Sequence, residues 1–327
     1  MRRTAVAIAC CGLGLGVPAG SAAADGGPVP PSQGGTGATA PGSPYTYVAL
    51  GARGSTVVAQ VKRAGGAVWG SRVLPGAWGV PGIAFDGSTA GLSADGRTLV
   101  LAGLTSRYPP RQTRIAVLDA HRLRVSRTFA LRGFFTVDAV SPAGRWLYFI
   151  HYGSPASPLS YEVRAYDLRA RRLLAKPVVD PREPDEDMQG LSLTRSVSAD
   201  GRWAYTLYMR PDGPMFVHAL DTARRTAACV DLPLDGRDVD TSVLRLAHGG
   251  GALRVVQDGR PLATIDTRTW AVRRAGVAPA GRTAPAARVD DGGAPWALLA
   301  AIPLAAGLAV AGGAAAARRR RRGAVAG

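Results

Sequence analysis

The sequence predicts an all-β protein, with a β-propeller-like repeat domain of about five four-stranded units followed by one C-terminal transmembrane helix. Three observations predict this fold class. A turn-and-strand motif occurs three times, a strand ending in Asp follows each turn glycine by 20 to 23 residues, and an uncharged apolar run precedes five consecutive arginines. No long amphipathic helical pattern interrupts the strands.

The repeated motif joins a tight turn directly to a strand. It reads SADGRTLVLA from Ser93, SPAGRWLYFI from Ser141 and SADGRWAYTLY from Ser198. Ser in the first position, Pro or Ala in the second and Gly in the fourth suit a type I turn. The residues after the turn are β-branched or aromatic on both faces, so we expect both faces of each strand to be covered.

The strands that end in Asp set the length of the repeat. They end at Asp119, Asp167 and Asp221, and a degenerate fourth copy ends at Asp266. The corresponding turn glycines are 48, 57 and 50 residues apart. These separations fall in the range of propeller blades with four strands each.

Residues 1–24 are predicted to be a secretory signal peptide. Two arginines follow Met1, residues 5–17 are apolar but short for a membrane span, and three alanines end the segment at a small-residue cleavage site. Cys10 and Cys11 raise the alternative of a lipoprotein, but too few apolar residues precede them.

Two segments are predicted to be flexible linkers because they are rich in Gly, Pro and Ala and cannot bury enough apolar surface to order themselves. These are residues 25–44 and residues 275–295. The propeller-like domain lies between them, at residues 45–274. Its expected strands are 45–50, 56–62 and 67–74 in a partial first unit; 82–85, 98–102, 114–118 and 125–131 in the second; 136–140, 146–152, 161–167 and 173–179 in the third; 193–197, 203–208, 215–220 and 227–232 in the fourth; and 243–247, 252–257, 262–267 and 270–273 in the fifth.

Residues 296–317 are predicted to span a membrane. They contain no charged residue and would extend roughly 33 Å as a helix, which matches the hydrocarbon core of a bilayer. The tail, residues 318–327, begins with five arginines and is therefore expected in the cytoplasm. The predicted topology is a single-pass membrane protein with its N-terminal domain outside the cell.

The formal charge of the chain is +17, and seven of its arginines lie in the signal peptide and the tail. A basic exported domain could favour wall polymers or phospholipid head groups. The chain has only two lysines and no asparagine, however, so biased codon usage explains the charge better than a selected basic patch. No module of interleaved basic and aromatic residues predicts a nucleic-acid partner.

Cysteine usage excludes an internal disulfide in the exported part, because Cys229 is the only cysteine outside the signal peptide. It lies in an apolar strand with no His or Lys near it in sequence, so we expect a buried, unreactive thiol.

The Ser-x-Asp-Gly-Arg turn and strand resembles the repeats of TolB and WD40-like propellers. The strands ending in Asp, each followed by a basic turn and another strand, resemble the YVTN-type repeats of surface-layer and lactonase-like propellers, although the Tyr-Val-Thr-Asn tetrapeptide is absent. The resemblance covers residues 45–274. It implies a propeller fold and leaves the activity open, because propellers carry many functions.

Recognisable catalytic motifs are absent from the sequence. It has no G-x-S-x-G elbow, H-E-x-x-H pair, zinc-binding cysteine pair or Walker loop. The acidic loop at residues 180–187 could bind Ca²⁺, but it lacks the Asp-x-Asp-x-Asp-Gly spacing and includes Arg182, so a solvated loop is the better interpretation. We therefore predict no catalytic residue, metal or cofactor.

Propellers generally bind ligands at the loops that join the second and third strands of a blade and the fourth strand to the next blade. Exposed aromatic side chains beside Arg on these loops suit a carbohydrate, an anionic polymer or a protein surface. The ligand-binding candidates from these loops are Trp78, Arg107, Tyr108, Arg111, His151, Tyr152, Glu183, Asp185 and Arg237.

Two functions fit these observations. The first is a membrane-tethered binding, sensing or scaffold module for a cell-envelope polymer or a surface protein. The alternative is an extracytoplasmic hydrolase of the lactonase-like or glycan-active kind. A hydrolase should bring carboxylates and a His together at the channel mouth, for example Glu183, Asp185 and His151.

Overall fold

The computed structural model describes residues 27–153, 157 and 159–275. All of them belong to the first of two compact units, residues 1–279 and 280–327. The predicted signal peptide, the transmembrane segment, the tail and all but the first residue of the second linker lie outside the described residues. In the part that the structure describes, no helix has the length and apolar character needed to cross a membrane.

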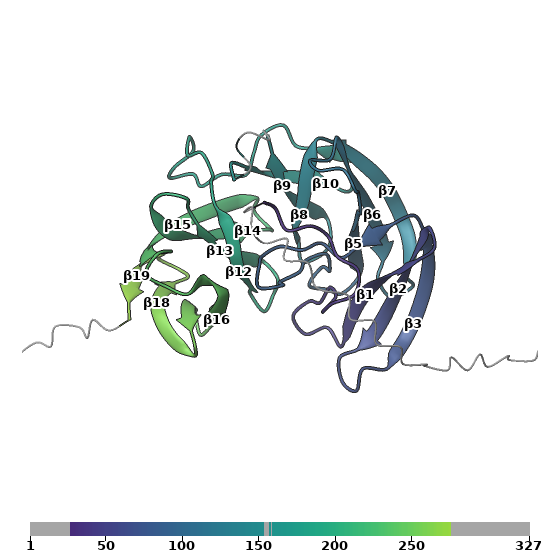
Figure 1. Cartoon of the computed structure of the whole chain (residues 1–327), viewed down its shortest axis with the longest axis horizontal. Helices are drawn as coiled ribbons and strands as arrows, with labels where there is room; N and C mark the ends of the chain where they lie inside the picture. The colour runs from purple at the N-terminus through teal and green to yellow at the C-terminus, as the bar shows by residue number, and fades with distance from the viewer. Residues whose placement is uncertain (1–26, 154–156, 158, 276–327) are drawn as a thin grey trace, which may run out of the picture. The chain divides into compact units, whose positions relative to one another are not determined.

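The described residues form five antiparallel sheets, four with four strands and one with three (Figure 1). Within each sheet, neighbouring strands are consecutive in sequence, as in propeller blades. Sheet 1 contains β1 (Tyr45–Ala52), β2 (Ser55–Lys62) and β3 (Val68–Pro75); sheet 2 contains β4 (Trp78–Gly79), β5 (Thr98–Gly103), β6 (Gln112–Asp119) and β7 (Arg124–Arg132); sheet 3 contains β8 (Phe134–Val140), β9 (Trp146–Tyr152), β10 (Glu162–Asp167) and β11 (Arg172–Leu173); sheet 4 contains β12 (Leu191–Val197), β13 (Trp203–Met209), β14 (Pro214–Asp221) and β15 (Thr226–Asp235); sheet 5 contains β16 (Leu244–Gly249), β17 (Ala252–Gln257), β18 (Arg260–Asp266) and β19 (Val272–Arg274).

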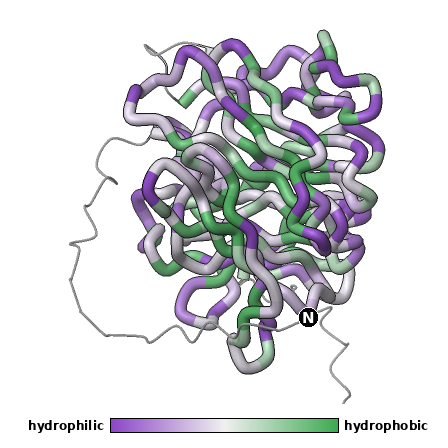
Figure 2. Tube along the Cα trace, turned by 90° about the vertical axis from the view of Figure 1, so that its right-hand side faces the viewer, coloured by the Kyte–Doolittle hydropathy of each residue, from purple (hydrophilic) through white to green (hydrophobic). Residues whose placement is uncertain are grey.

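The prediction of an all-β repeat domain with five propeller-like units is confirmed by this topology. One short 3₁₀ helix, Thr241–Val243, is the only helical element among the described residues. Four hydrophobic clusters join the sheets in order, sheet 1 with 2, 2 with 3, 3 with 4 and 4 with 5. Hydrophobic stretches run through the middle of the tube in Figure 2, and many of its outer bends are hydrophilic. No cluster of described residues joins sheet 5 to sheet 1.

The two sequence signatures meet in the folded chain. In sheet 4, Arg202 of the turn bonds the carboxylate of Asp221 at 2.5 and 3.0 Å. In sheet 3, the equivalent arginine lies 3.3 Å from Asp167. Antiparallel register explains the spacing, because each Asp pairs with the residue that follows the turn arginine, as Asp221 pairs with Trp203. In sheets 3 and 4, the turn and the strand end thus form one unit that closes the hairpin.

Two predicted strands differ from the structure. The first strand of sheet 2 is Trp78–Gly79, not residues 82–85, which belong instead to a loop that reaches β12. There the amide of Phe85 donates to the carbonyl of Ser192 at 3.1 Å, so the loop forms backbone bonds with a distant sheet. The last strand of sheet 3 is only two residues long, and just beyond it the side chain of Arg164 donates to the carbonyl of Leu174 at 2.7 Å.

Residues 27–44 also differ from the expected flexible linker. Ser32 and Val80 form a β-bridge, and Ala38 forms another with Tyr47 of β1. Ala38 is fully buried, and the amide of Gln33 donates to the carbonyl of Trp78 at 3.0 Å. Small side chains let this segment approach the strand edges closely, so backbone hydrogen bonds order a sequence that has few apolar residues of its own.

Candidate functional site

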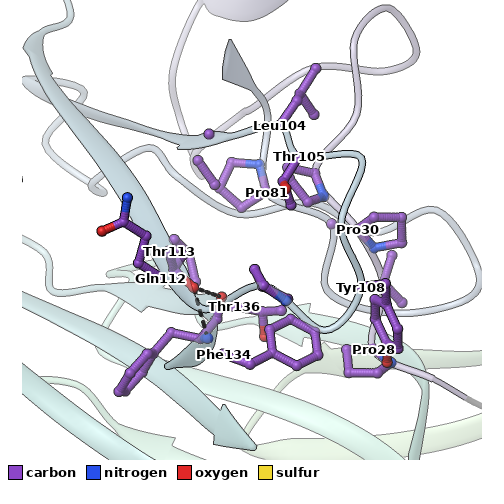
Figure 3. Close-up of a pocket in the computed structure, with 18 of the residues that line it drawn as sticks. Pro28, Pro30, Pro81, Leu104, Thr105, Tyr108, Gln112, Thr113, Phe134 and Thr136 are labelled. Atoms are coloured by element: carbon purple, nitrogen blue, oxygen red, sulfur yellow. Dashed lines mark hydrogen bonds between the residues drawn. The ribbon is translucent and has the colours of Figure 1, made fainter. Parts of the chain in front are cut away.

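A cavity of about 170 Å³ opens at the loops that join the second and third strands of sheet 2 and that lead into sheet 3 (Figure 3). Four separate segments form it: residues 28–31, residues 81–82, the stretch from the end of β5 to the start of β6 at residues 102–113, and the start of β8. These connections are of the two kinds expected to carry a ligand.

The walls of the cavity are mainly apolar and aromatic. Pro28, Pro30 and Pro81 line it with rigid rings, and the ring of Tyr108 meets the ring of Phe134 edge to face at 5.3 Å. The side chain of Tyr108 is 63% exposed, so its ring is available to contact a ligand. Arg107 is the one charged residue in the lining that the structure describes.

Few polar groups in the cavity are free to orient a ligand. The hydroxyl of Thr113 is committed to the loop, because it contacts the carbonyls of Gly133 and Phe135 at 3.1 and 3.2 Å. Gln112, Thr105 and Thr136 complete the polar lining. The cavity therefore offers broad apolar contact with a small number of hydrogen-bonding groups, which is the usual composition of a ligand site.

A run of aromatic side chains continues from the cavity across sheets 3 and 4. Successive ring centres lie 5.3, 4.9, 6.3, 5.3 and 5.2 Å apart. We call this run the aromatic ladder, and its members in order are Tyr108, Phe134, Tyr152, Tyr161, Tyr208 and Phe216. Its far end is closed by Arg210, whose guanidinium lies 4.1 Å from the ring of Phe216 and bonds Glu186 at 2.9 Å.

The buried phenols of the ladder remain protonated at physiological pH. Burial raises the pKa of Tyr152, Tyr161 and Tyr208 above the ordinary value of 10.0. The hydroxyl of Tyr161 is buried and has no hydrogen-bond partner among the described residues. The ladder can donate hydrogen bonds but supplies no base.

The structure brings four of the predicted site residues to this region. Arg107 and Tyr108 line the cavity, and Tyr152 belongs to the ladder. His151 stacks on Phe135 at 4.3 Å, and its Nδ1 lies 3.7 Å from a carboxylate oxygen of Glu162. Residues that the sequence analysis did not predict complete the cavity, above all Phe134 and the prolines of residues 28–31.

Three other predicted residues lie elsewhere or take no part in the cavity. Trp78 is predicted from the sequence to be an exposed ligand-binding residue, but it is buried. It is 6% exposed, lies in the core between sheets 1 and 2, and donates its indole N–H to the carbonyl of Pro75 at 2.8 Å. Arg111 is exposed beside the cavity. Arg237 is largely exposed and lies 3.8 Å from the carboxylate of Asp212.

The acidic loop is anchored by one buried carboxylate. Asp180 is 3% exposed and accepts hydrogen bonds from Arg182 and from the amide of Cys229, the latter at 2.8 Å. Burial alone would raise the pKa of Asp180, but these hydrogen bonds outweigh it and lower the pKa. Hydrogen bonding with Glu186 raises the pKa of Glu183.

The constellation expected of a hydrolase is not assembled in the described part of the chain. Glu183 and Asp185 are exposed in the acidic loop, and none of the described polar contacts joins either of them to His151. Among residues 27–153, 157 and 159–275, no group of three His, Cys, Asp or Glu side chains is placed to hold a metal ion.

Sheet register does bring a Cys and a His together. His218 and Cys229 are cross-strand partners, and the thiol lies 3.8 Å from His218 Nδ1. Burial raises the pKa of Cys229 to about 12, and it lowers the pKa of His218. Both groups are therefore neutral, whereas a nucleophilic pair needs a thiolate beside an imidazolium.

No protein-family model and no curated protein sequence matches the chain. Among solved structures, it is similar to hydrazine synthase from Kuenenia stuttgartiensis (14% identity, 76% of this chain and 66% of that one, TM-score 0.43) and to TolB from Acinetobacter baumannii (13%, 73% and 51%, 0.41). It is also similar to the Cps50 (Swd1) β-propeller domain from Myceliophteria thermophila (12%, 73% and 69%, 0.41). The chain thus spans about half of the TolB chain and just under two thirds of the hydrazine synthase chain.

Proposed function

We propose that this protein is a membrane-tethered binding module that presents its propeller-like domain outside the cell. Its ligand, a cell-envelope polymer or a surface protein, binds at the cavity beside Tyr108 and Phe134. The observation that carries the proposal is this aromatic-walled cavity, formed by four segments that the fold holds together.

The chemistry of the cavity and its surroundings favours ligand binding over catalytic turnover. Rigid proline and aromatic rings supply contact area at a low entropic cost, and the flanking ladder anchors that surface in the core. The Cys229–His218 pair is neutral, and none of the described contacts joins His151 to the acidic residues that a hydrolase would use with it. Arg107, the charged residue in the described lining, can orient a ligand by its guanidinium group.

The tether follows from the sequence. A cleaved signal would export the domain, the apolar residues 296–317 would stop transfer, and the arginine tail would stay inside. The strands ending in Asp resemble those of YVTN-type propellers of surface-layer proteins, and the proposal includes a relationship of this domain to that class.

Retention on isolated cell envelopes tests the binding site. Replacing Tyr108 by Ala should weaken retention about tenfold, in the range of an aromatic residue at the centre of an interface. Trp69→Ala is the matched control, because Trp69 is 62% exposed on sheet 1, away from the cavity. It should leave retention unchanged.

The same protein should not hydrolyse lactones or glycans. If the purified domain does so, and Glu183→Ala or His151→Ala abolishes the turnover, the hydrolase alternative replaces the binding proposal. Equal retention of the Tyr108→Ala variant and the parent would show that the ligand does not bind at this cavity.

A further inference from the structure

One face of sheet 5 carries a row of arginines. Register aligns Arg254 of β17 with Ala247 of β16 and with Thr264 of β18, and it aligns Thr264 with Arg273 of β19. Residues paired in this way point to the same face of an antiparallel sheet. Arg245, two residues before Ala247, shares that face. We call Arg245, Arg254 and Arg273 the arginine face.

This face is directed away from the core. The alternate residues Leu246, Leu253, Val255 and Ile265 are buried and pack against sheet 4. The three arginines are exposed, and no described sheet covers them. In a closed ring this surface would pack on another blade and would be expected to be apolar.

The charge of the arginine face is not balanced within the described chain. Some arginines of sheets 2 to 4 form ion pairs with acidic side chains, such as Arg145 with Asp167 and Arg202 with Asp221. None of the described ion pairs includes an arginine of the arginine face.

The acidic groups of sheet 5 do not compensate for it. Only Asp258 and Asp266 occur between residues 244 and 275, and both lie at turns. Asp266 lies on the same face at the end of β18, where it accepts the amides of Arg268 and Thr269 at 2.9 Å, and this single charge leaves the three arginines in excess.

The shape and chemistry of the face suit a broad anionic surface. The residues between the arginines are small or β-branched, namely Ala247, Val256 and Thr264, so they would not hold a flat partner away. Guanidinium groups bind phosphate oxygens in a bidentate manner and lose little hydration when they do so.

The arginine face is also close in sequence to the predicted membrane span. The sheet ends at Arg274, and about 21 residues separate it from residue 296. The flexible linker predicted from the sequence would have an r.m.s. end-to-end distance of about 25 Å. The linker would therefore keep sheet 5 near the bilayer that holds the chain.

We propose that the arginine face binds the anionic phospholipid head groups of the membrane in which the chain is anchored, and so orients the propeller-like domain on the bilayer. The proposal rests on the tether part of the proposed function. It does not depend on what binds in the cavity, because the cavity is formed by sheets 2 and 3 and not by sheet 5.

Vesicle co-sedimentation of residues 25–279 tests this surface. These residues contain all four described core clusters, which lie between Ala38 and Ile265. The domain should sediment with phosphatidylcholine vesicles that contain about one-third phosphatidylglycerol, but not with phosphatidylcholine alone. Salt of about 0.5 M should abolish the binding, because it shortens the screening length.

A triple variant and its matched control separate the face from net charge. Arg245→Gln/Arg254→Gln/Arg273→Gln should lower vesicle affinity by about tenfold or more. Arg53→Gln/Arg72→Gln/Arg124→Gln removes three exposed arginines of sheets 1 and 2 and should lower it far less. Equal losses in the two variants would refute the proposal.

Two further outcomes complete the test. Tyr108→Ala should bind vesicles like the parent. If the parent domain does not bind anionic vesicles but still shows envelope retention that depends on Tyr108, this proposal is overturned and the proposed function stands. Binding to polyglycerol phosphate in solution, without binding to anionic vesicles, would assign the arginine face to a wall polymer and would also overturn it.

Discussion

Buried carboxylates end the third strands of sheets 3 and 4, at Asp167 and Asp221. Asp221 is 1% exposed, bonds Arg202, and accepts the amides of Ala223 and Arg224 at 3.0 Å. Burial by itself would raise the pKa of Asp221. The hydrogen bonds outweigh that effect and hold the pKa below its ordinary value of 3.8.

The depressed pKa of Asp221 predicts acid sensitivity. The stabilisation is fully present above the unfolded-state pKa of about 3.9, and it is lost as the pH falls through the folded-state pKa. The Asp221→Asn variant should lose about 2–3 kcal/mol at neutral pH, because charged hydrogen bonds disappear. Its unfolding free energy should then fall less than that of the parent below about pH 4.

Urea unfolding across pH measures this effect. Asp258→Asn is the control, because Asp258 is exposed in a turn and should leave the profile unchanged. Parallel pH profiles for the parent and Asp221→Asn would contradict the role of this carboxylate.

Cys229 is predicted to be unreactive in the native protein. It is 9% exposed, and burial raises its pKa to about 12, so almost no thiolate exists near neutral pH. A thiol reagent at pH 8 should modify it only after unfolding in urea. Rapid modification of the native domain would show that the Cys229–His218 pair is activated.

At the scale of the element, the repeated turn combines a left-handed glycine with contacts that differ between blades. Gly201 has φ of +68°, and a side chain there would overlap Ala94. Gly96 has nearly the same φ, +69°, but open space where its Cβ would lie. Equivalent positions in the motif therefore differ only in their tertiary surroundings.

This difference predicts unequal effects of the same substitution. Gly201→Val and Gly96→Val should both lose the free energy of placing a β-branched residue at positive φ. Gly201→Val should lose about 1–3 kcal/mol more, because its side chain collides with Ala94. Urea unfolding of the two variants provides the comparison, and equal losses would show that the turn alone determines the cost.

At the scale of the whole molecule, residues 27–44 connect the neighbouring sheets 1 and 2, and the loop at residues 81–90 connects sheet 2 with the more distant sheet 4. The first segment pairs with residues of β1 and beside β4, and the second reaches β12. Sheets 1 and 5 share no described core cluster, so these crossing segments add contacts that the succession of sheets does not provide.

Removing residues 27–44 should therefore destabilise the domain. A chain that starts at Tyr45 exposes the surface that covers Ala38 and leaves the carbonyl of Trp78 without the amide of Gln33. We expect a loss of more than about 2 kcal/mol and faster hydrogen exchange in sheets 1 and 2. A flexible linker would instead change the stability by less than about 0.5 kcal/mol.

The predicted topology makes a separate demand on intact cells. Protease added outside should remove the chain up to residue 296 and leave a short C-terminal fragment, because only the arginine tail is expected inside. Detection with a C-terminal tag measures the fragment. Full protection of the domain until the cells are lysed would contradict an external propeller.

The sequence by itself determined the fold class, the number of repeat units and most strands. These features are local and recur: a turn glycine, an Asp at the strand end and apolar residues at strand spacing report on the same hairpin in each copy. Residues 98–102 and 203–208, for example, fall within β5 and β13. The candidate site was predictable only in part, since loop position selected Arg107, Tyr108 and Tyr152 without showing what surrounds them.

Only the tertiary structure decided the path of residues 27–44, the burial of Trp78, the Cys229–His218 contact and the cavity itself. Each depends on segments far apart in sequence that meet through backbone hydrogen bonds or sheet register. Gly-rich and Pro-rich segments carry no apolar period, so their composition indicates a linker even where strand edges supply the missing partners. The cavity combines four separate segments, only some of them rich in Pro or Gly, and no one of them alone predicts its geometry.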